Sequence, residues 1–286
     1  MFRTRFAPSP TGPLHLGHAY SACLAHDMAR AQNGEFVLRI EDIDQSRARD
    51  HWTTGIYEDL TWLGLTWDGP VLAQSDQIPS YRGQLKSLWD KGLLYVCTCK
   101  RRDILAAISA PQEGVPMSPD GILYPGTCRT RGIGREAQDL PDAVLRLDMK
   151  AACHAAGTEL SFQETGSGPN GETGLQRFTA ADAISDIGDI VLARRDMGTS
   201  YHLSVVMDDA LQNISHVVRG QDLYDATRIH VILQKLLGLA TPLYHHHDLI
   251  RDDVGKRLAK RDDARAISRY KADGATPQQV RARVGL

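Results

Sequence analysis

The chain has 286 residues and a formal net charge of -2, so it can bury a full core and shows no global sign of binding nucleic acid. Its start has no apolar signal segment. The sequence also lacks a run of 18 apolar residues, and this excludes helices that span a membrane. We therefore expect a cytoplasmic protein with no membrane partner. Of five cysteines, three lie between residues 97 and 128, which favours a metal site over disulfides.

The N-terminal part is predicted to alternate strands and helices. Segments 2–7 and 36–40 are typical of strands, and a helical pattern lies between them, which predicts a βαβ unit in a parallel sheet. A second helix is predicted after Ser46, and a third over about 80–91, ending at Gly92.

Glycine, proline and polar residues concentrate between about 97 and 180, which indicates an inserted module. After it we expect further alternation in an α/β fold. Segments 190–194, 203–207 and 216–218 are predicted strands, and 210–213 and 224–237 are predicted helical.

The segment from Pro10 to His18 joins the first predicted strand to its helix. His15 and His18 are three residues apart and share one helix face, and Gly17 lets a ligand approach the backbone. Unpaired N–H groups at a helix start favour phosphate, so the pattern indicates a nucleotide triphosphate. A helix start whose histidines are merely polar is the alternative.

Three predicted strands end at or beside Ala7, Glu41 and Arg219. Ligands of parallel sheets bind at the carboxyl ends of the strands, so these residues are expected to form one site.

Residues 5–12 (RFAPSPTG), 15–18 (HLGH) and 39–44 (RIEDID), with Arg47 after them, resemble the motifs of class I aminoacyl-tRNA synthetases of the glutamyl branch. Residues 256–261 (KRLAKR) are similar to the mobile lysine loop of these enzymes. Lys260 matches the lysine assigned to ATP, whereas Arg257 and Ala259 replace the usual lysine and serine.

The resemblance implies a class I Rossmann-like parallel sheet with helices on both faces. It divides the chain into a first half of the catalytic domain (1–96), an inserted zinc-binding or acceptor-type module (97–180), a second half (181–244), and the lysine loop with a short basic C-terminal segment (245–286).

Only 25 residues follow Arg261, too few for the anticodon-binding domains of glutamyl-tRNA synthetases. A shortened core of this kind resembles the glutamyl-queuosine tRNA(Asp) synthetases. That resemblance implies activation of L-glutamate by ATP with Mg²⁺, followed by transfer to queuosine in the anticodon loop of tRNA(Asp). We expect a monomer with glutamate, ATP and this tRNA as partners.

The resemblance also assigns roles to single residues. A buried glutamate carboxylate must be paired, and guanidinium suits it, while an acidic group suits the ammonium. The glutamate site is expected to contain Arg5, Ala7, Ser9, Glu41, Tyr201 and Arg219. The ATP site is expected to contain His15, Gly17, His18 and Lys260, with both histidines and the lysine catalytic. Structural ion pairs of the two arginines and a core position for Tyr201 are the alternatives.

Cys97, Cys99 and Cys128 supply three thiolates of a tetrahedral structural zinc site. Tyr124 matches the family's Tyr-x3-Cys pattern as the fourth ligand, with Cys153 or His154 as alternatives, and ordinary reduced cysteines as the simpler interpretation. Three adjacent histidines, His245 to His247, cannot all face one metal if they lie on a strand.

Three other functions stay open at this point. They are a compact glutamyl-tRNA synthetase that charges a 3′ end, a catalytically silent paralogue that only binds tRNA, and a small-molecule nucleotidyltransferase.

Overall fold

The computed structural model describes residues 1–108, 115–132, 138–250 and 265–286. Its N-terminal part confirms the predicted βαβ unit, because β1 and β2 pair in parallel with Arg3 opposite Glu35 and Phe6 opposite Leu38. β3 adds a short parallel edge to β2. The elements here are β1 (Arg3–Phe6), α1 (Leu16–Ala31), β2 (Glu35–Ile40), α2 (Asp50–Trp62), β3 (Leu72–Ala73) and α3 (Ile78–Asp90).

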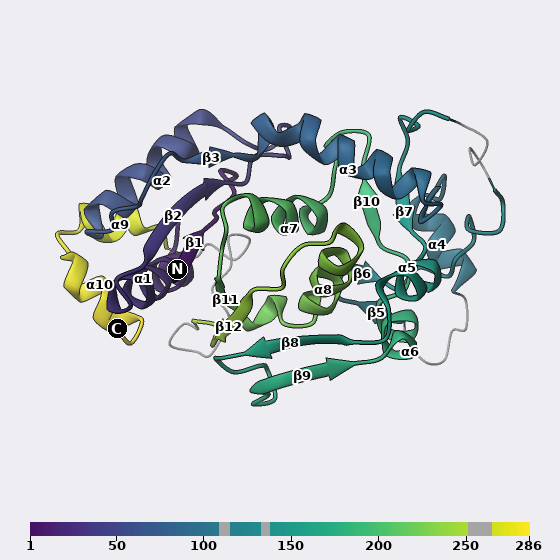
Figure 1. Cartoon of the computed structure of the whole chain (residues 1–286). Coiled ribbons are helices and arrows are strands. Elements are labelled where there is room, and N and C mark those ends of the chain that lie inside the picture. The colour runs from purple at the N-terminus through teal and green to yellow at the C-terminus, as the bar shows by residue number, and fades with distance from the viewer. Residues whose placement is uncertain (109–114, 133–137, 251–264) are drawn as a thin grey trace.

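A second sheet continues the parallel arrangement in the order β11-β12-β8-β9. Its strands are β8 (Leu160–Glu164), β9 (Gly174–Phe178), β11 (His216–Gly220) and β12 (Leu243–His247). Only β9 runs antiparallel to its neighbour. β11 lies beside β1, since Ser215 N donates to Arg3 O at 3.0 Å and Arg5 Nη1 donates to Val218 O at 3.1 Å. The carboxyl ends of β1, β2 and β11 therefore meet at one edge (Figure 1).

The strand predicted over 203–207 is wrong, because these residues lie inside the helix α7 (Tyr201–Leu211). The hydroxyl of Ser200 caps the helix by accepting from Leu203 N at 3.4 Å. Seven of the helix residues are buried, on most of its faces, so the sequence lacks the polar stripe that reveals an amphipathic helix.

A separate antiparallel sheet, in the order β10-β7-β4, supports the middle of the chain. The predicted strand over 190–194 is its edge strand. The elements here are β4 (Leu94–Val96), α4 (Arg101–Ala107), β5 (Met117–Ser118), β6 (Gly121–Ile122), β7 (Leu145–Leu147), α5 (Met149–Ala156), α6 (Ala180–Asp182) and β10 (Val191–Ala193).

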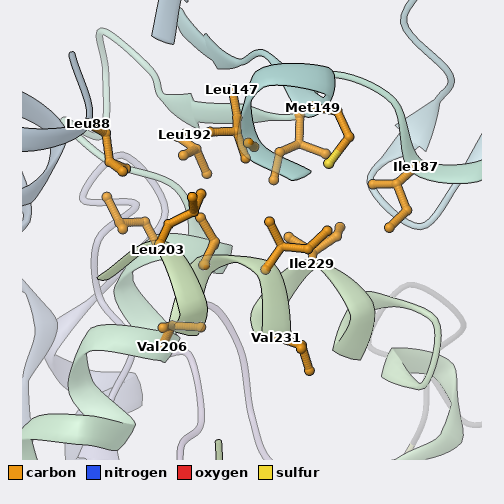
Figure 2. Packing of buried hydrophobic residues seen from close by; sticks show 14 of the residues in the cluster. Leu88, Leu147, Met149, Ile187, Leu192, Leu203, Val206, Ile229 and Val231 are labelled. Carbon is orange, nitrogen blue, oxygen red and sulfur yellow. The ribbon is translucent and has the colours of Figure 1, made fainter. Parts of the chain in front are cut away.

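The larger hydrophobic core joins the antiparallel sheet to the second parallel sheet and its helices. Figure 2 shows Leu203 of α7 and Ile229 of α8 (Ala226–Leu237) facing Leu147, Met149 and Leu192, and all of these side chains are at most 1% exposed. Burying a leucine or isoleucine side chain contributes about 2 kcal/mol, so this cluster fixes α7 and α8 firmly. Both helices contribute residues to the site described below.

The C-terminal helices α9 (Ile267–Ala272) and α10 (Pro277–Arg283) pack at the N-terminal end of the molecule (Figure 1). Arg281 forms an ion pair with Asp27 of α1, and Ile267 N donates to Leu14 O at 2.9 Å. The chain thus returns next to His15 after the segment 251–264. Within the described ranges, no helix combines the length and the apolar character that crossing a bilayer requires.

Candidate active site

One cavity of about 580 Å³ lies at the shared edge of the parallel strands. It is lined by all of the predicted substrate residues that the structure describes: Arg5, Ala7, Ser9, His15, Gly17, His18, Glu41, Tyr201 and Arg219. Lys260, with Arg257 and Ala259, lies outside the described residues. The fold therefore places residues from four separate segments, which the sequence predicted to share a site, around one cavity.

The two histidines form the start of α1. His15 is its N-cap residue, and its Nδ1 accepts from Gly17 N at 3.1 Å. Nδ1 of His18 in turn accepts from His15 N at 3.1 Å. Because both Nδ1 atoms act as acceptors, each ring, when neutral, carries its proton on Nε2.

A buried carboxylate that the sequence did not reveal organises the floor of the site. Asp209 of α7 accepts from Arg5 Nε at 3.1 Å and from Arg39 Nη2 at 2.6 Å. Burial alone would raise the pKa of Asp209, but the two guanidinium groups outweigh it and lower the pKa below its usual range. Asp209 thus partly neutralises the charge of Arg5, as expected from the alternative interpretation that Arg5 forms a structural ion pair. Asp209 was missed because residues 203–207, which precede it in the same helix, were predicted as a strand.

Glu41 follows β2 and lines the same cavity. Its backbone N donates to Pro8 O at 3.0 Å, which ties the ends of β1 and β2 together. Burial raises the pKa of the Glu41 carboxyl to about 7, and the nearby Asp208 and Asp209 add to the rise, although Arg39 and Arg5 oppose it. Carboxyl groups with such raised pKa values are typical of functional sites.

Arg219, at the end of β11, is surrounded by neutral groups. Its Nε donates to His246 Nε2 at 3.1 Å, and its Nη1 lies 3.1 Å from His230 Nδ1. Its Nη2 donates to Thr227 Oγ1 at 2.7 Å and to Leu223 O at 3.1 Å. Among the residues with described positions, no carboxylate forms an ion pair with Arg219. Its charge is therefore available to a bound anion.

The adjacent histidines of β12 have different partners, as the strand geometry requires. His246 contacts Arg219 and Glu164, whereas His247 Nε2 lies 2.7 Å from Ser21 Oγ and lines the cavity. His245 lies beside Thr165. They do not form a metal site together.

The sulfur atoms of Cys97, Cys99 and Cys128 lie within 4.8 Å of one another. The hydroxyl of Tyr124 lies 3.6 Å from Cys97 Sγ and 3.5 Å from Cys99 Sγ. With Zn–S near 2.3 Å and Zn–O near 2.0 Å, a tetrahedral ion separates sulfur and oxygen by about 3.5 Å, so this donor set fits zinc.

The surroundings of the cysteines also suit a bound cation with thiolate ligands. Burial alone would raise the pKa of Cys128, but hydrogen bonds from Tyr124, Thr98 and Cys99 outweigh it and lower the pKa to about 6. Arg146 Nε donates to Cys97 Sγ at 3.4 Å and offsets thiolate charge. The alternative ligand Cys153 is buried in the larger core, and His154 is exposed on α5, so neither joins the cluster.

Comparison with known proteins agrees with this arrangement. The family model of class I tRNA synthetases (E and Q), catalytic domain, matches residues 1–118 and 178–286. The solved glutamate-tRNA synthetase of Elizabethkingia anophelis superposes with a TM-score of 0.69 at 25% identity, covering 91% of this chain. The chain spans about half of that protein, 53% of its length. The chain thus has the fold of a class I synthetase catalytic domain, an aminoacyl-transferring enzyme with a Rossmann-like fold.

Two relatives are similar over nearly the whole chain. A glutamyl-Q tRNA(Asp) synthetase of Rhodobacter capsulatus is 61% identical over 283 residues, 99% of each chain. One of Symbiobacterium thermophilum is 39% identical and covers 96% of this chain and 83% of its own. The chain belongs to the glutamyl-Q tRNA(Asp) synthetase family. The residue roles, the domain boundaries and the monomeric state stay predictions.

Proposed function

We propose that the protein activates L-glutamate with ATP and transfers it to the queuosine base in the anticodon loop of tRNA(Asp). The observation that carries the proposal is that Glu41 and Arg219, of opposite charge, line one cavity at the carboxyl ends of parallel strands. An acidic amino acid presents an ammonium group and carboxylates, and each needs a partner when it leaves water. Both relatives are named glutamyl-Q tRNA(Asp) synthetases.

In the proposed complex, Glu41 pairs with the ammonium group of glutamate. Arg219 receives the side-chain carboxylate through its charge and through the one N–H group that its four hydrogen bonds within the protein leave over. Tyr201, the first residue of α7, and Arg5 complete the walls. A neutral glutamine side chain would gain much less from the charge of Arg219, so the site selects glutamate.

Activation follows at the start of α1. The α-carboxylate of glutamate attacks the α-phosphorus of ATP in line, and pyrophosphate leaves with the electrons of the broken P–O bond. The Nε2–H groups of His15 and His18 and the positive end of the helix stabilise the phosphates. Lys260 and Mg²⁺ are proposed to neutralise further charge. Positioning and charge stabilisation suffice for such a step, and no protein nucleophile is needed.

The second step transfers the glutamyl group to RNA. A hydroxyl of the cyclopentenediol ring of queuosine attacks the carbonyl carbon of glutamyl-adenylate. AMP leaves with the electrons of the broken C–O bond, and the hydroxyl proton passes to solvent. The acceptor must enter through the cavity that Arg47, Asp222 and Leu249 also line.

We also propose a structural zinc ion bound by Cys97, Cys99, Cys128 and the oxygen of Tyr124. The ion would join β4 and its following turn to the loop that carries Tyr124 and Cys128. This site is separate from the cavity and takes no part in the proposed chemistry.

The test uses the purified protein, ATP, Mg²⁺, radiolabelled glutamate, and tRNA from cells with or without queuosine. We expect label on queuosine-containing tRNA(Asp) only, and we expect it to stay after nuclease removal of the 3′-terminal adenosine. His18→Ala should abolish labelling, whereas His154→Ala, exposed on α5, should leave it unchanged.

Label lost with the 3′ adenosine would instead identify a compact glutamyl-tRNA synthetase. Absence of both label and glutamate-dependent pyrophosphate exchange would contradict the proposal and favour a silent paralogue. Exchange without an RNA product would leave a small-molecule nucleotidyltransferase.

A further inference from the structure

The hydrogen bonds around Arg219 define the protonation of the histidines that contact it. A guanidinium donates only, so the facing nitrogen of each histidine must be an unprotonated acceptor. These atoms are His246 Nε2 at 3.1 Å from Arg219 Nε, and His230 Nδ1 at 3.1 Å from Arg219 Nη1. Each ring can therefore carry a proton only on its other nitrogen.

The second nitrogen of each ring has a partner that can accept a hydrogen bond from its N–H group. His246 Nδ1 lies 2.5 Å from Glu164 Oε2, and Glu164 is 1% exposed. His230 Nε2 lies 3.2 Å from His202 Nδ1, and His202 Nε2 lies 3.3 Å from Asp120 Oδ1 on the turn between β5 and β6. Both chains of hydrogen bonds thus run in one direction, away from Arg219 and towards a carboxylate.

Both imidazoles are held in the neutral form. Burial lowers the pKa of His230 well below its usual value, and the charge of Arg219 lowers it further. Burial likewise lowers the pKa of His246, although Glu164 partly opposes the shift. The nearest carboxylate on each chain is therefore separated from Arg219 by at least one neutral ring, in contrast to Arg5, which contacts Asp209 directly.

We propose that His230 and His246 are positioning residues that make the site selective for a carboxylate side chain, because they hold Arg219 in place without neutralising its charge. This inference rests on the proposed function and deepens it. Four hydrogen bonds fix the guanidinium, and all of their acceptors are uncharged: two imidazoles, the Thr227 hydroxyl and the Leu223 carbonyl. An acidic acceptor at either histidine position would fix the arginine equally well but would occupy its charge.

The decisive comparison is between His230→Asn and His230→Asp, which have the same shape and differ only in charge. Asparagine places an amide oxygen near the former Nδ1 and keeps a neutral acceptor for Arg219. Aspartate places a carboxylate there. We expect the asparagine variant to keep the glutamate KM within about threefold of the natural protein. We expect the aspartate variant to raise that KM at least tenfold over the asparagine variant and to lower the preference for glutamate over glutamine by a similar factor.

The readouts are glutamate-dependent and glutamine-dependent pyrophosphate exchange, and calorimetric binding of glutamate without ATP. The ATP KM should stay within about twofold in both variants, a separation that general damage to the fold would not produce. Equal glutamate affinity of the two variants would overturn the inference. If His230→Asp does not fold, His230→Leu replaces it, with the asparagine variant expected to bind glutamate at least tenfold more tightly; equal binding again overturns the inference.

Failure of the proposed function has a different signature. In that case the natural protein itself shows no glutamate-dependent exchange and no glutamate binding, and the inference fails with it. Activity of the natural protein together with equal variants contradicts only the role of the histidines.

Discussion

Arg39 Nε and Glu41 Oε1 lie 3.7 Å apart, too far for a hydrogen bond between these oppositely charged side chains. Arg39 is completely buried, its Nε has no hydrogen-bond partner among the residues that the structure describes, and its shortest ion pair goes to Asp209. Glu41 is therefore close to positive charge but not satisfied by it, and burial raises its pKa to about 7. Such a carboxylate can pair with the positively charged group of a bound ligand.

The first prediction concerns the pH dependence of glutamate binding. Only ionised Glu41 can pair with the ammonium group of the substrate, and its pKa in the free protein is about 7. Affinity should therefore rise as the pH increases from about 6 to 8 and level off above that range. Glu41→Gln should weaken binding at pH 8 at least tenfold and remove this dependence. Calorimetric titration across the pH range measures both, and an unchanged pH profile in the variant would contradict the role of Glu41.

The same substitution should stabilise the protein. A carboxyl group whose pKa is raised in the folded state lowers the stability of the protein at higher pH. The loss develops as the pH rises from the pKa of the group in the unfolded chain, 4.5, to its pKa in the folded protein, about 7, because the unfolded chain releases the proton first. Glutamine avoids this loss, so the gain should grow across that window and reach up to about 3 kcal/mol above it. Urea unfolding at pH 4.5 and pH 8 measures the difference. A gain of equal size at both pH values would show that ionisation of Glu41 is not its cause.

The third prediction concerns Asp209, which holds Arg5 and Arg39 together. Asp209→Asn keeps the shape but leaves two buried guanidinium groups without their shared anion, which should cost about 3–5 kcal/mol of unfolding free energy. Glutamate activation should fall with it, because Arg5 loses its anchor. The control is Asp90→Asn in the exposed pair with Lys86, where surface ion pairs contribute at most about 0.5 kcal/mol. Equal loss in both variants would contradict the central position of Asp209.

The sequence was sufficient to propose residues that bind substrate and that line one cavity, but it did not reveal the residues that hold them. Arg5, Glu41 and Arg219 lie at or beside the ends of β1, β2 and β11, and a motif at a strand end can be found without knowing the packing. Asp209 lies on α7, which is buried on many faces and so lacks the 3.6-residue pattern. His230 lies on α8, a helix that the sequence did predict, but its contact with Arg219 follows only from the packing. The direction of the hydrogen bonds around Arg219 likewise follows only from distances between atoms.

The fourth prediction tests the oxygen ligand of the proposed zinc site. The natural protein should bind one zinc ion per chain, and Cys128→Ser should lose it with a lower melting temperature. Tyr124→Phe keeps the ring beneath Arg146, which lies 3.9 Å from its centroid, and removes only the oxygen. It should keep the ion but release it to a competing chelator at least tenfold more readily. Elemental analysis and chelator competition measure these effects, and release at the natural rate would exclude the oxygen as a ligand.

The last prediction separates ATP binding from stability at the start of α1. A Cβ atom at Gly17 would lie 3.0 Å from His15 Cε1, so Gly17→Ala requires the ring that caps the helix to shift by a few tenths of an ångström. We expect the ATP KM to rise at least tenfold while calorimetric glutamate binding stays unchanged. Because alanine favours a helix by about 1 kcal/mol over glycine, and losing a cap costs about as much, the melting temperature should change little. Gly55→Ala in α2, where nothing lies within 4 Å, is the matched control and should stabilise the protein without affecting ATP. An unchanged ATP KM in Gly17→Ala would show that the His15 ring position does not matter for nucleotide binding.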